Sequence, residues 1–263
     1  MTPLFGFGIA KEEHFSALPS KMPENLAFVE IPGELLDDSA VCRKLKSYSV
    51  KRHTAVVIRD IVPAYLVDAV PFSPLRLKVE FDSKFRTRCE TASQIGCRVV
   101  SAEFNTRRAC KEKIYRNELV KWLHSIAGVL DEYKLKLTLP LHVFGETASS
   151  ELESLVDLQH ELFYPGFRYL LHFHWNEPEA FEVLGKVSSI LKFERNFWRL
   201  TYRPEPDCIL DLSILEQLHP VWNSVQGRMP VFVGIDSGSL RPEQCVLESV
   251  SGMIEQFVSN QAQ

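Results

Sequence analysis

The chain has 263 residues, of which 45% are hydrophobic and 24% charged, so it is long enough to bury the core of one large globular domain. Its net charge of −4 offers no general attraction to a polyanion, which argues against nucleic acid as the partner. There is no basic leader segment and no run of about 18 apolar residues, so we expect a cytoplasmic protein that makes no contact with a membrane. The six cysteines form no C-x-x-C pair and are expected to be reduced.

Eight short β-rich runs recur along the chain, and amphipathic stretches separate them. The runs occupy residues 4–10, 26–32, 54–61, 97–105, 135–144, 167–175, 196–203 and 230–237. Helices are predicted most clearly over residues 35–48, 74–96, 110–133 and 241–260. Strands that alternate with helices imply a parallel sheet, and eight such units in 263 residues match a single-domain (β/α)8 TIM barrel of the α/β class over residues 1–263. An open doubly wound sheet is the alternative, although no G-x-G-x-x-G follows an early strand.

Two local signals mark the ends of the predicted helices. Asp37 and Asp38 stand in the first turn of the 35–48 stretch, where carboxylates favour the positive end of the helix dipole. Gly96 closes the 74–96 stretch at the position where glycine commonly ends a helix.

Polar residues gather at the ends of the eight runs, which is where the reactive groups of such barrels lie. The set comprises Glu30, Arg59, Asp60, Glu103, Asn105, His142, His172, His174, Arg199, Arg203 and Asp236. Because strand residues alternate in direction, His172 and His174 share one face. By the same rule Thr138 and His142 lie opposite four leucines, and the three alternate residues Ser101, Glu103 and Asn105 share a face.

Each of these residues also has a purely structural interpretation. Glu30 could anchor a turn before Pro32, Asp60 could pair with Arg59, and Asp236 could cap the last helix. The two imidazoles of the sixth run are harder to explain in this way, because buried imidazoles need hydrogen-bond partners or a metal.

Two kinds of ligand fit the strand ends. Three histidines with one or two carboxylates suit Zn²⁺, Mn²⁺ or Fe²⁺. Ser237 and Gly238 follow the last run, where barrels often bind phosphate through backbone N–H groups, and Arg199 or Arg203 could add a charge-assisted bond to the same anion. An ordinary serine-capped loop is the alternative there.

The layout resembles the xylose-isomerase-like TIM barrels, a superfamily of sugar-phosphate isomerases and epimerases that also includes endonuclease IV. The resemblance rests on LAFVEIPG at 26–33, CETASQIGCRVVSAEFN at 89–105, LKLTLPLHVF at 135–144 and PVFVGIDS at 230–237. The superfamily holds its metal with Glu after strand five, Asp and a nearby His around strand six, and Glu after strand eight. Those positions fall here on His142, on His172 and His174, and on Asp236.

The resemblance therefore implies a sugar or sugar-phosphate isomerase or epimerase with a noncanonical metal site. In that interpretation Glu103 and Asp236 are the catalytic carboxylates. Glu30, Asn105, Arg199, Arg203, Ser237 and Gly238 bind a small carbohydrate-like substrate. Two alternatives stay open: a barrel that has lost the metal and acts as a binding or regulatory protein, and a phosphodiesterase of the endonuclease IV kind. The sequence leaves open whether the chain forms a homo-oligomer.

Overall fold

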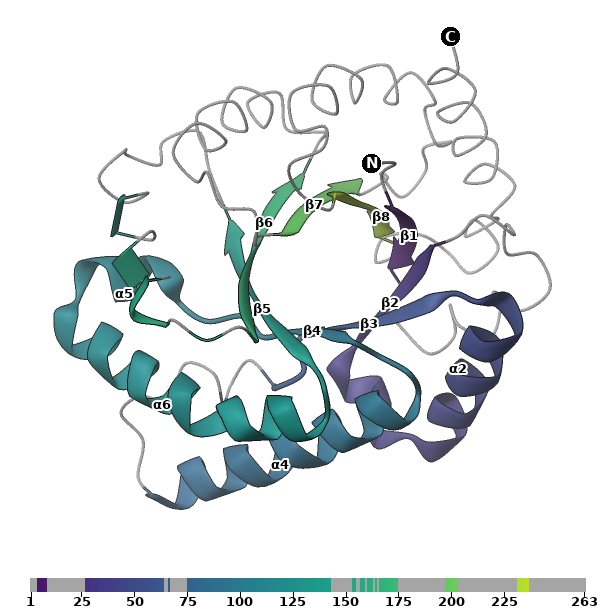
Figure 1. Cartoon of the computed structure of the whole chain (residues 1–263), viewed down its shortest axis with the longest axis horizontal. Helices are drawn as coiled ribbons and strands as arrows, with labels where there is room; N and C mark the ends of the chain where they lie inside the picture. The colour runs from purple at the N-terminus through teal and green to yellow at the C-terminus, as the bar shows by residue number, and fades with distance from the viewer. Residues whose placement is uncertain are drawn as a thin grey trace, which may run out of the picture.

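Eight strands pair in chain order, all parallel, and close into a barrel in the computed structural model of the chain (Figure 1). They are β1 (Leu4–Gly8), β2 (Phe28–Pro32), β3 (Ala55–Arg59), β4 (Val99–Ser101), β5 (Lys136–His142), β6 (Phe167–His174), β7 (Phe197–Tyr202) and β8 (Val231–Asp236). The structure describes residues 4–8, 27–63, 66, 75–142, 153–154, 157–158, 160–162, 164, 166–174, 197–202 and 231–236. The predicted α/β class and TIM barrel are confirmed.

The described helices lie outside the barrel wall, along the side formed by β2 to β5 (Figure 1). They are the 3-10 helix η1 (Gly33–Asp37) and the α-helices α2 (Ser39–Arg52), α4 (Leu75–Gln94), α5 (Thr106–Lys111) and α6 (Lys113–Glu132). None of these helices is both long enough and apolar enough to cross a membrane.

Local sequence sets the helix ends. The Asp38 carboxylate caps α2 by accepting the backbone N–H groups of Ala40 at 2.6 Å and Val41 at 3.3 Å. Helix α4 ends at Gln94, two residues before Gly96, which has a φ of +87°. The backbone N–H of Cys97 donates to the carbonyl of Ala92 at 2.9 Å. This is the hydrogen-bond pattern of a glycine-terminated helix, as predicted for Gly96.

One set of alternate strand positions is apolar and fully covered. Val29, Ile31, Val56, Ile58 and Leu137 are each at most 2% exposed. These side chains form the outer face of the barrel wall, beneath the helices. Their burial removes apolar surface from water, which is the main force that holds such a helical layer on its sheet.

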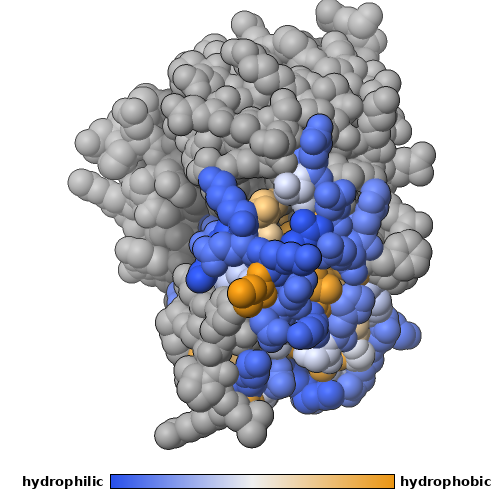
Figure 2. All heavy atoms as spheres, turned by 90° about the vertical axis from the view of Figure 1, so that its left-hand side faces the viewer, coloured by the Kyte–Doolittle hydropathy of each residue, from blue (hydrophilic) through white to orange (hydrophobic). Residues whose placement is uncertain are grey.

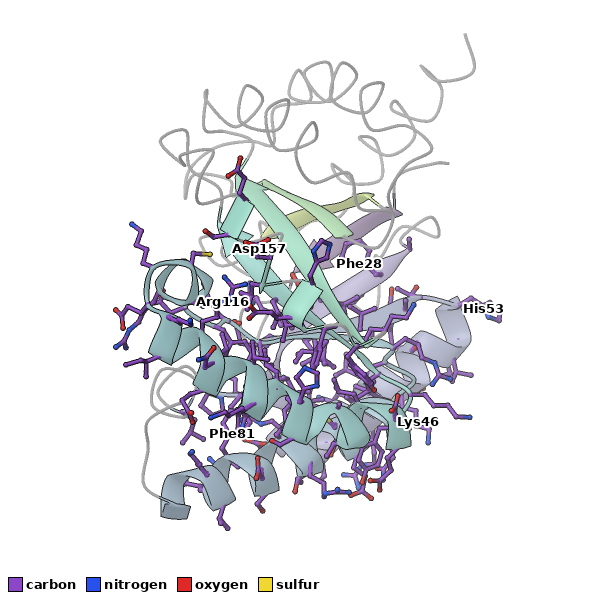
Figure 3. The ribbon with its side chains drawn as sticks, turned by 60° about the vertical axis from the view of Figure 1, so that its left-hand side comes forward. Phe28, Lys46, His53, Phe81, Arg116 and Asp157 are labelled. Atoms are coloured by element: carbon purple, nitrogen blue, oxygen red, sulfur yellow. The ribbon has the colours of Figure 1, made fainter. Side chains whose placement is uncertain are left out.

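Aromatic side chains fill the space between α4, α6 and the wall. The ring of Trp122 meets that of Phe81 edge-on at 4.3 Å between centroids, and Phe104 lies 5.3 Å from the same indole. Figure 3 shows Phe81 in this helical layer and Phe28 among the strands. Three helices each leave one large apolar residue exposed, namely Val50, Val79 and Ile114, and the described surface in Figure 2 is mostly hydrophilic with small separate apolar spots.

The inside of the barrel begins with a close contact between β1 and β2. Gly6 is the register partner of Phe28, and a Cβ on Gly6 would overlap the Phe28 ring. The missing side chain of Gly6 therefore makes room for a large ring that is itself only 4% exposed.

Several predicted boundaries differ in the structure, and three of the differences matter most. The 35–48 stretch begins as the η1 turn, and its α-helix starts only after Asp38 because that residue is the cap. The 110–133 stretch is part of two helices, since Glu112 takes an extended conformation with φ −115° and ψ 101°. Strand β4 ends at Ser101, so the alternation expected over 97–105 does not reach Glu103 or Asn105. The predicted helix over 241–260 lies outside the described residues.

Candidate active site at the barrel mouth

Strand register decides which predicted residues share a face of the barrel wall. Starting from Glu30, the register partners are Val57 on β3 and Gly8 on β1, and Gly8 is in turn the partner of Asp236 on β8. This set alternates with the covered apolar set, so it occupies the lumen face. Glu30 is 4% exposed, so a carboxylate is held inside the barrel wall near its carboxyl edge.

The histidines occupy neighbouring positions on the same face. His142 is the register partner of His172, which is the partner of Arg199, and His174 is the partner of Thr201. Thr201 pairs with Gly234, two residues before Asp236, so the face is continuous from β5 to β8. The sequence could not settle the face of Arg199, because a one-residue slip in register exchanges the faces of a strand. In the structure the backbone of Arg199 is in register with that of His172.

Buried hydroxyls line the β4 and β5 part of this face, below the mouth. Ser101 and Thr138 are register partners and are 2% and 1% exposed. The Thr138 hydroxyl donates to the carbonyl of Val100 at 3.2 Å, so it is satisfied within the wall. Thr138 thus lies opposite the covered leucines Leu137 and Leu139, as strand alternation predicted.

A strained corner follows β3. Asp60 has a φ of +51°, which a residue with a side chain rarely adopts, and its carboxylate lies 3.7 Å from the guanidinium of Arg59. The Ser101 side chain and backbone oxygens accept the N–H groups of Asp60 at 3.2 Å and Ile61 at 2.8 Å. A Cβ at Gly33 would overlap the Asp60 carbonyl oxygen. The corner is therefore held by Ser101 at the end of β4 and by Gly33 after β2. The pairing of Asp60 with Arg59, expected as its structural role, is observed.

Arg88 braces this corner from outside the barrel. Its guanidinium donates to both carboxylate oxygens of Asp37, at 3.0 and 2.7 Å, and to the carbonyl of Ile61 at 3.0 Å. Arg88 is 4% exposed, and the charged hydrogen bonds that it donates hold the pKa of Asp37 below its usual value. Sequence reasoning missed Arg88, although a signal existed. Arg88 stands on the apolar stripe of α4 with Phe81 and Phe85, where a cation needs a partner.

The remaining predicted site residues lie at different places. Glu103 is exposed in the loop between β4 and α5, and Asn105 is also exposed. The Asn105 side chain accepts the backbone N–H of Arg108 at 2.9 Å and so caps α5. Arg203, Ser237 and Gly238 lie outside the described residues, and their roles stay predictions.

A divalent metal is compatible with the donor set that the register assembles. Among the side chains that the structure describes, no three His, Cys, Asp or Glu residues form a metal site. The register nevertheless puts His142, His172, Asp236 and Glu30 on one lumen face at the carboxyl ends of their strands. Imidazole nitrogens with one or two carboxylates are a donor set of the kind that Zn²⁺, Mn²⁺ and Fe²⁺ accept.

Solved structures share this architecture at low sequence identity. The chain aligns with D-psicose 3-epimerase with D-tagatose from Clostridium cellulolyticum H10 at a TM-score of 0.63, with 9% identity over 97% of this chain and 98% of that one. A xylose isomerase domain protein from Planctomyces limnophilus aligns at 0.62, with 11% identity over 98% and 97% of the two chains. The IolI protein, solved with a binding zinc atom, aligns at 0.58 with 14% identity over 97% and 98%.

These likenesses show the fold, a TIM barrel shared with these solved structures, as the sequence predicted. No protein-family model and no curated protein matches the sequence.

Proposed function

We propose that the protein is a sugar or sugar-phosphate isomerase or epimerase that uses a noncanonical divalent-metal site at the mouth of its barrel. The observation that carries the proposal is the register of the lumen face. It aligns His142 with His172 and Arg199 on one side of the barrel, and Glu30 with Asp236 through Gly8 on the other. The solved structures of the same fold include sugar epimerases, which supports the reaction class.

In this proposal His142, His172 and His174 hold the metal, with Asp236 as a further ligand or as a catalytic carboxylate. A bound divalent ion supplies Lewis-acid polarisation of the substrate carbonyl. A site built mainly from neutral imidazoles carries less negative charge than one built from carboxylates. It is therefore expected to prefer Zn²⁺, Mn²⁺ or Fe²⁺ over Mg²⁺.

The chain's own residues move the proton. Glu103 or Asp236 removes it from the carbon beside the substrate carbonyl. A proton is then donated either to the opposite face of that carbon, by the other of these two carboxyl groups, or to the former carbonyl carbon, by the same group. The first outcome is epimerisation and the second is isomerisation. Glu103 is exposed at the mouth, so a role for it requires that bound substrate covers it.

Substrate binding is assigned to the rest of the predicted set. Glu30 lies inside the wall and can accept hydrogen bonds from sugar hydroxyls. Arg199 is on β7, the strand that pairs with β6, which carries His172 and His174. Asn105, Arg203, Ser237 and Gly238 complete the proposed set. If the substrate carries a phosphate, Arg199 and Arg203 are its proposed partners.

The test is the metal content of untagged protein, measured by plasma mass spectrometry for the wild type and three variants. We expect about one equivalent of Zn, Mn or Fe in the wild type, because the proposed site holds one ion. His142→Ala and His172→Ala should each lose it. His124→Ala is the matched control, because His124 is exposed on α6, where its ring lies 3.2 Å from the Glu161 carbonyl oxygen.

Two outcomes would change the assignment. If the wild type stays free of metal after incubation with each ion, the protein is better explained as a barrel that binds ligands without the metal chemistry. If metal is present but neither histidine variant alters it, the site lies elsewhere. If metal-loaded protein converts no ketose and no ketose phosphate in a panel of sugars, the proposed reaction class is wrong, although the metal site would still stand.

A further inference from the structure

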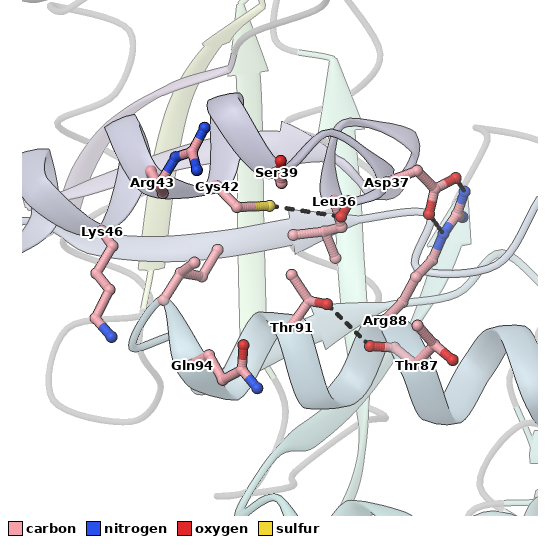
Figure 4. Close-up of a pocket in the computed structure, with 11 residues that line it drawn as sticks. Leu36, Asp37, Ser39, Cys42, Arg43, Lys46, Thr87, Arg88, Thr91 and Gln94 are labelled. Carbon is pink, nitrogen blue, oxygen red and sulfur yellow. Dashed lines mark hydrogen bonds and ion pairs between the residues drawn. The ribbon is translucent and has the colours of Figure 1, made fainter.

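A pocket lies on the outside of the barrel, between α2 and α4 (Figure 4). Its volume is about 570 Å³, which is the size of pockets that hold small metabolites. Leu36 and Ile95 form its apolar part, and both are at most 5% exposed. The lumen face belongs to the opposite side of the wall, so this pocket is separate from the proposed active site.

The charge of the pocket differs from that of the whole protein. Helix α2 carries five cations, Arg43, Lys44, Lys46, Lys51 and Arg52, and no carboxylate between Ser39 and Arg52, whereas the chain as a whole has a net charge of −4. Two of these cations, Arg43 and Lys46, line the pocket. The lining contains one carboxylate, Asp37, and Arg88 already neutralises it through the bidentate pair.

Neutral polar groups form the α4 side of the pocket. Thr87, Thr91 and Gln94 line the pocket from α4, and Figure 4 shows Lys46 and Gln94 toward one end of it, with Asp37 and Arg88 at the other. No ion pair joins Arg43 or Lys46 to a carboxylate of the part of the chain that the structure describes. The hydroxyls of Thr87 and Thr91 donate to the carbonyls of Ser83 and Thr87, at 3.0 and 3.1 Å, and one N–H of Gln94 donates to Glu90 at 3.3 Å. The two unneutralised cations are therefore the main donors that the pocket offers, and they suit a group with several anionic oxygens.

We propose that this pocket binds a small phosphate-bearing molecule, with Arg43 and Lys46 contacting the phosphate and the second side-chain N–H of Gln94 donating to another of its oxygens. The ligand class follows from charge and size. The excess of about two positive charges matches a phosphomonoester dianion, and the volume has room for an attached sugar. The site is independent of the proposed catalytic function.

The test is calorimetric titration with inorganic phosphate and with D-ribose 5-phosphate, using D-ribose as the uncharged comparison. The informative variant is Arg43→Gln with Lys46→Gln. Its matched control is Lys44→Gln with Lys51→Gln, which removes the same charge from exposed positions of the same helix that do not line the pocket. We expect the first pair to weaken phosphate binding on the order of tenfold or more, and the control to change it less than about threefold at physiological salt.

Cys42 provides a second readout that reports on the pocket alone. Its thiol is half-buried in the pocket lining, 3.5 Å from the Leu36 carbonyl, and burial raises its pKa. Ribose 5-phosphate should slow the alkylation of Cys42, measured by peptide mass spectrometry, in the wild type and in the control but not in the Arg43→Gln/Lys46→Gln variant.

Three results would overturn the proposal. One is a wild type that binds neither phosphate compound at concentrations up to about 10 mM. Another is equal weakening in the two double variants, which would show only a general effect of charge. The third is binding that is lost in Arg199→Gln and retained in Arg43→Gln/Lys46→Gln, which would place the phosphate at the barrel mouth instead.

Discussion

The buried guanidinium of Arg88 allows a prediction that separates two ways of losing the same ion pair. Arg88→Met keeps the length and apolar volume of the side chain but removes every hydrogen bond that it donates. The Ile61 carbonyl loses its donor inside the protein, which costs about 1–3 kcal/mol. The Asp37 carboxylate, whose side chain is 59% exposed, returns to water and adds at most about 1 kcal/mol. We therefore expect Arg88→Met to lower the free energy of unfolding by about 2–3 kcal/mol.

Asp37→Ala removes the exposed partner and leaves the cation behind. Arg88, with a side chain 5% exposed, would then be a buried charge without its counter-charge, and such losses typically cost about 3–5 kcal/mol. We expect about 3 kcal/mol here, because water can reach the place that Asp37 vacates. Removing the exposed acid should thus cost at least as much as removing the buried base.

The assay is reversible urea unfolding of the wild type, the two single variants and the double variant. The double variant contains no buried cation, so its loss should match that of Arg88→Met alone and not the sum of the two. A neutral Asp37→Ala, or a double variant whose loss equals the sum of the single losses, would refute the reasoning.

The same pair gives a pH dependence with a definite sign. The pKa of Asp37 is lowered in the folded protein from its ordinary value of 3.8, mainly by the hydrogen bonds from Arg88. A carboxylate with a depressed pKa stabilises the fold above its unfolded pKa, and this contribution is lost as pH falls through the folded pKa. The stability difference between the wild type and Arg88→Met should therefore be constant near neutral pH and shrink below about pH 4.

Two further predictions concern glycine and cysteine positions. Gly6→Ala should destabilise the protein by about 1–3 kcal/mol, because the new Cβ overlaps the Phe28 ring, whereas Gly128→Ala has open space in α6 and should stabilise it by about 0.5–1 kcal/mol. Equal effects of the two variants in urea unfolding would contradict the packing of β1 against β2. Burial raises the pKa of the Cys97 thiol to about 12, so iodoacetamide at pH 8 should leave Cys97 unmodified in folded protein and alkylate it in urea. Rapid modification of native Cys97, detected by peptide mass spectrometry, would show that this part of the wall opens readily.

Local pattern was sufficient to find all eight strands and the glycine that follows α4. The alternation in β5 identified Leu137 and Leu139 as covered and Thr138 as facing the lumen, because strand direction depends only on neighbouring residues. Gly96 ended α4 because a positive φ is inexpensive for glycine alone. Boundaries were less certain. Ser101 ends β4 four residues before the predicted limit, and Glu112 divides the predicted helix, because both depend on packing against other elements.

The sequence by itself determined the class of fold and the list of polar residues that follow the strands, since both are carried by short-range periodicity. Only the tertiary structure decided which residues of different strands lie side by side and which partners they meet. The pairing of β6 with β7 sets Arg199 in register with His172. Arg88 binds Asp37, which is 51 residues away in the sequence. Register and long-range pairing depend on how whole elements pack, and a shift of one residue would exchange the faces of a strand without changing a letter of its sequence.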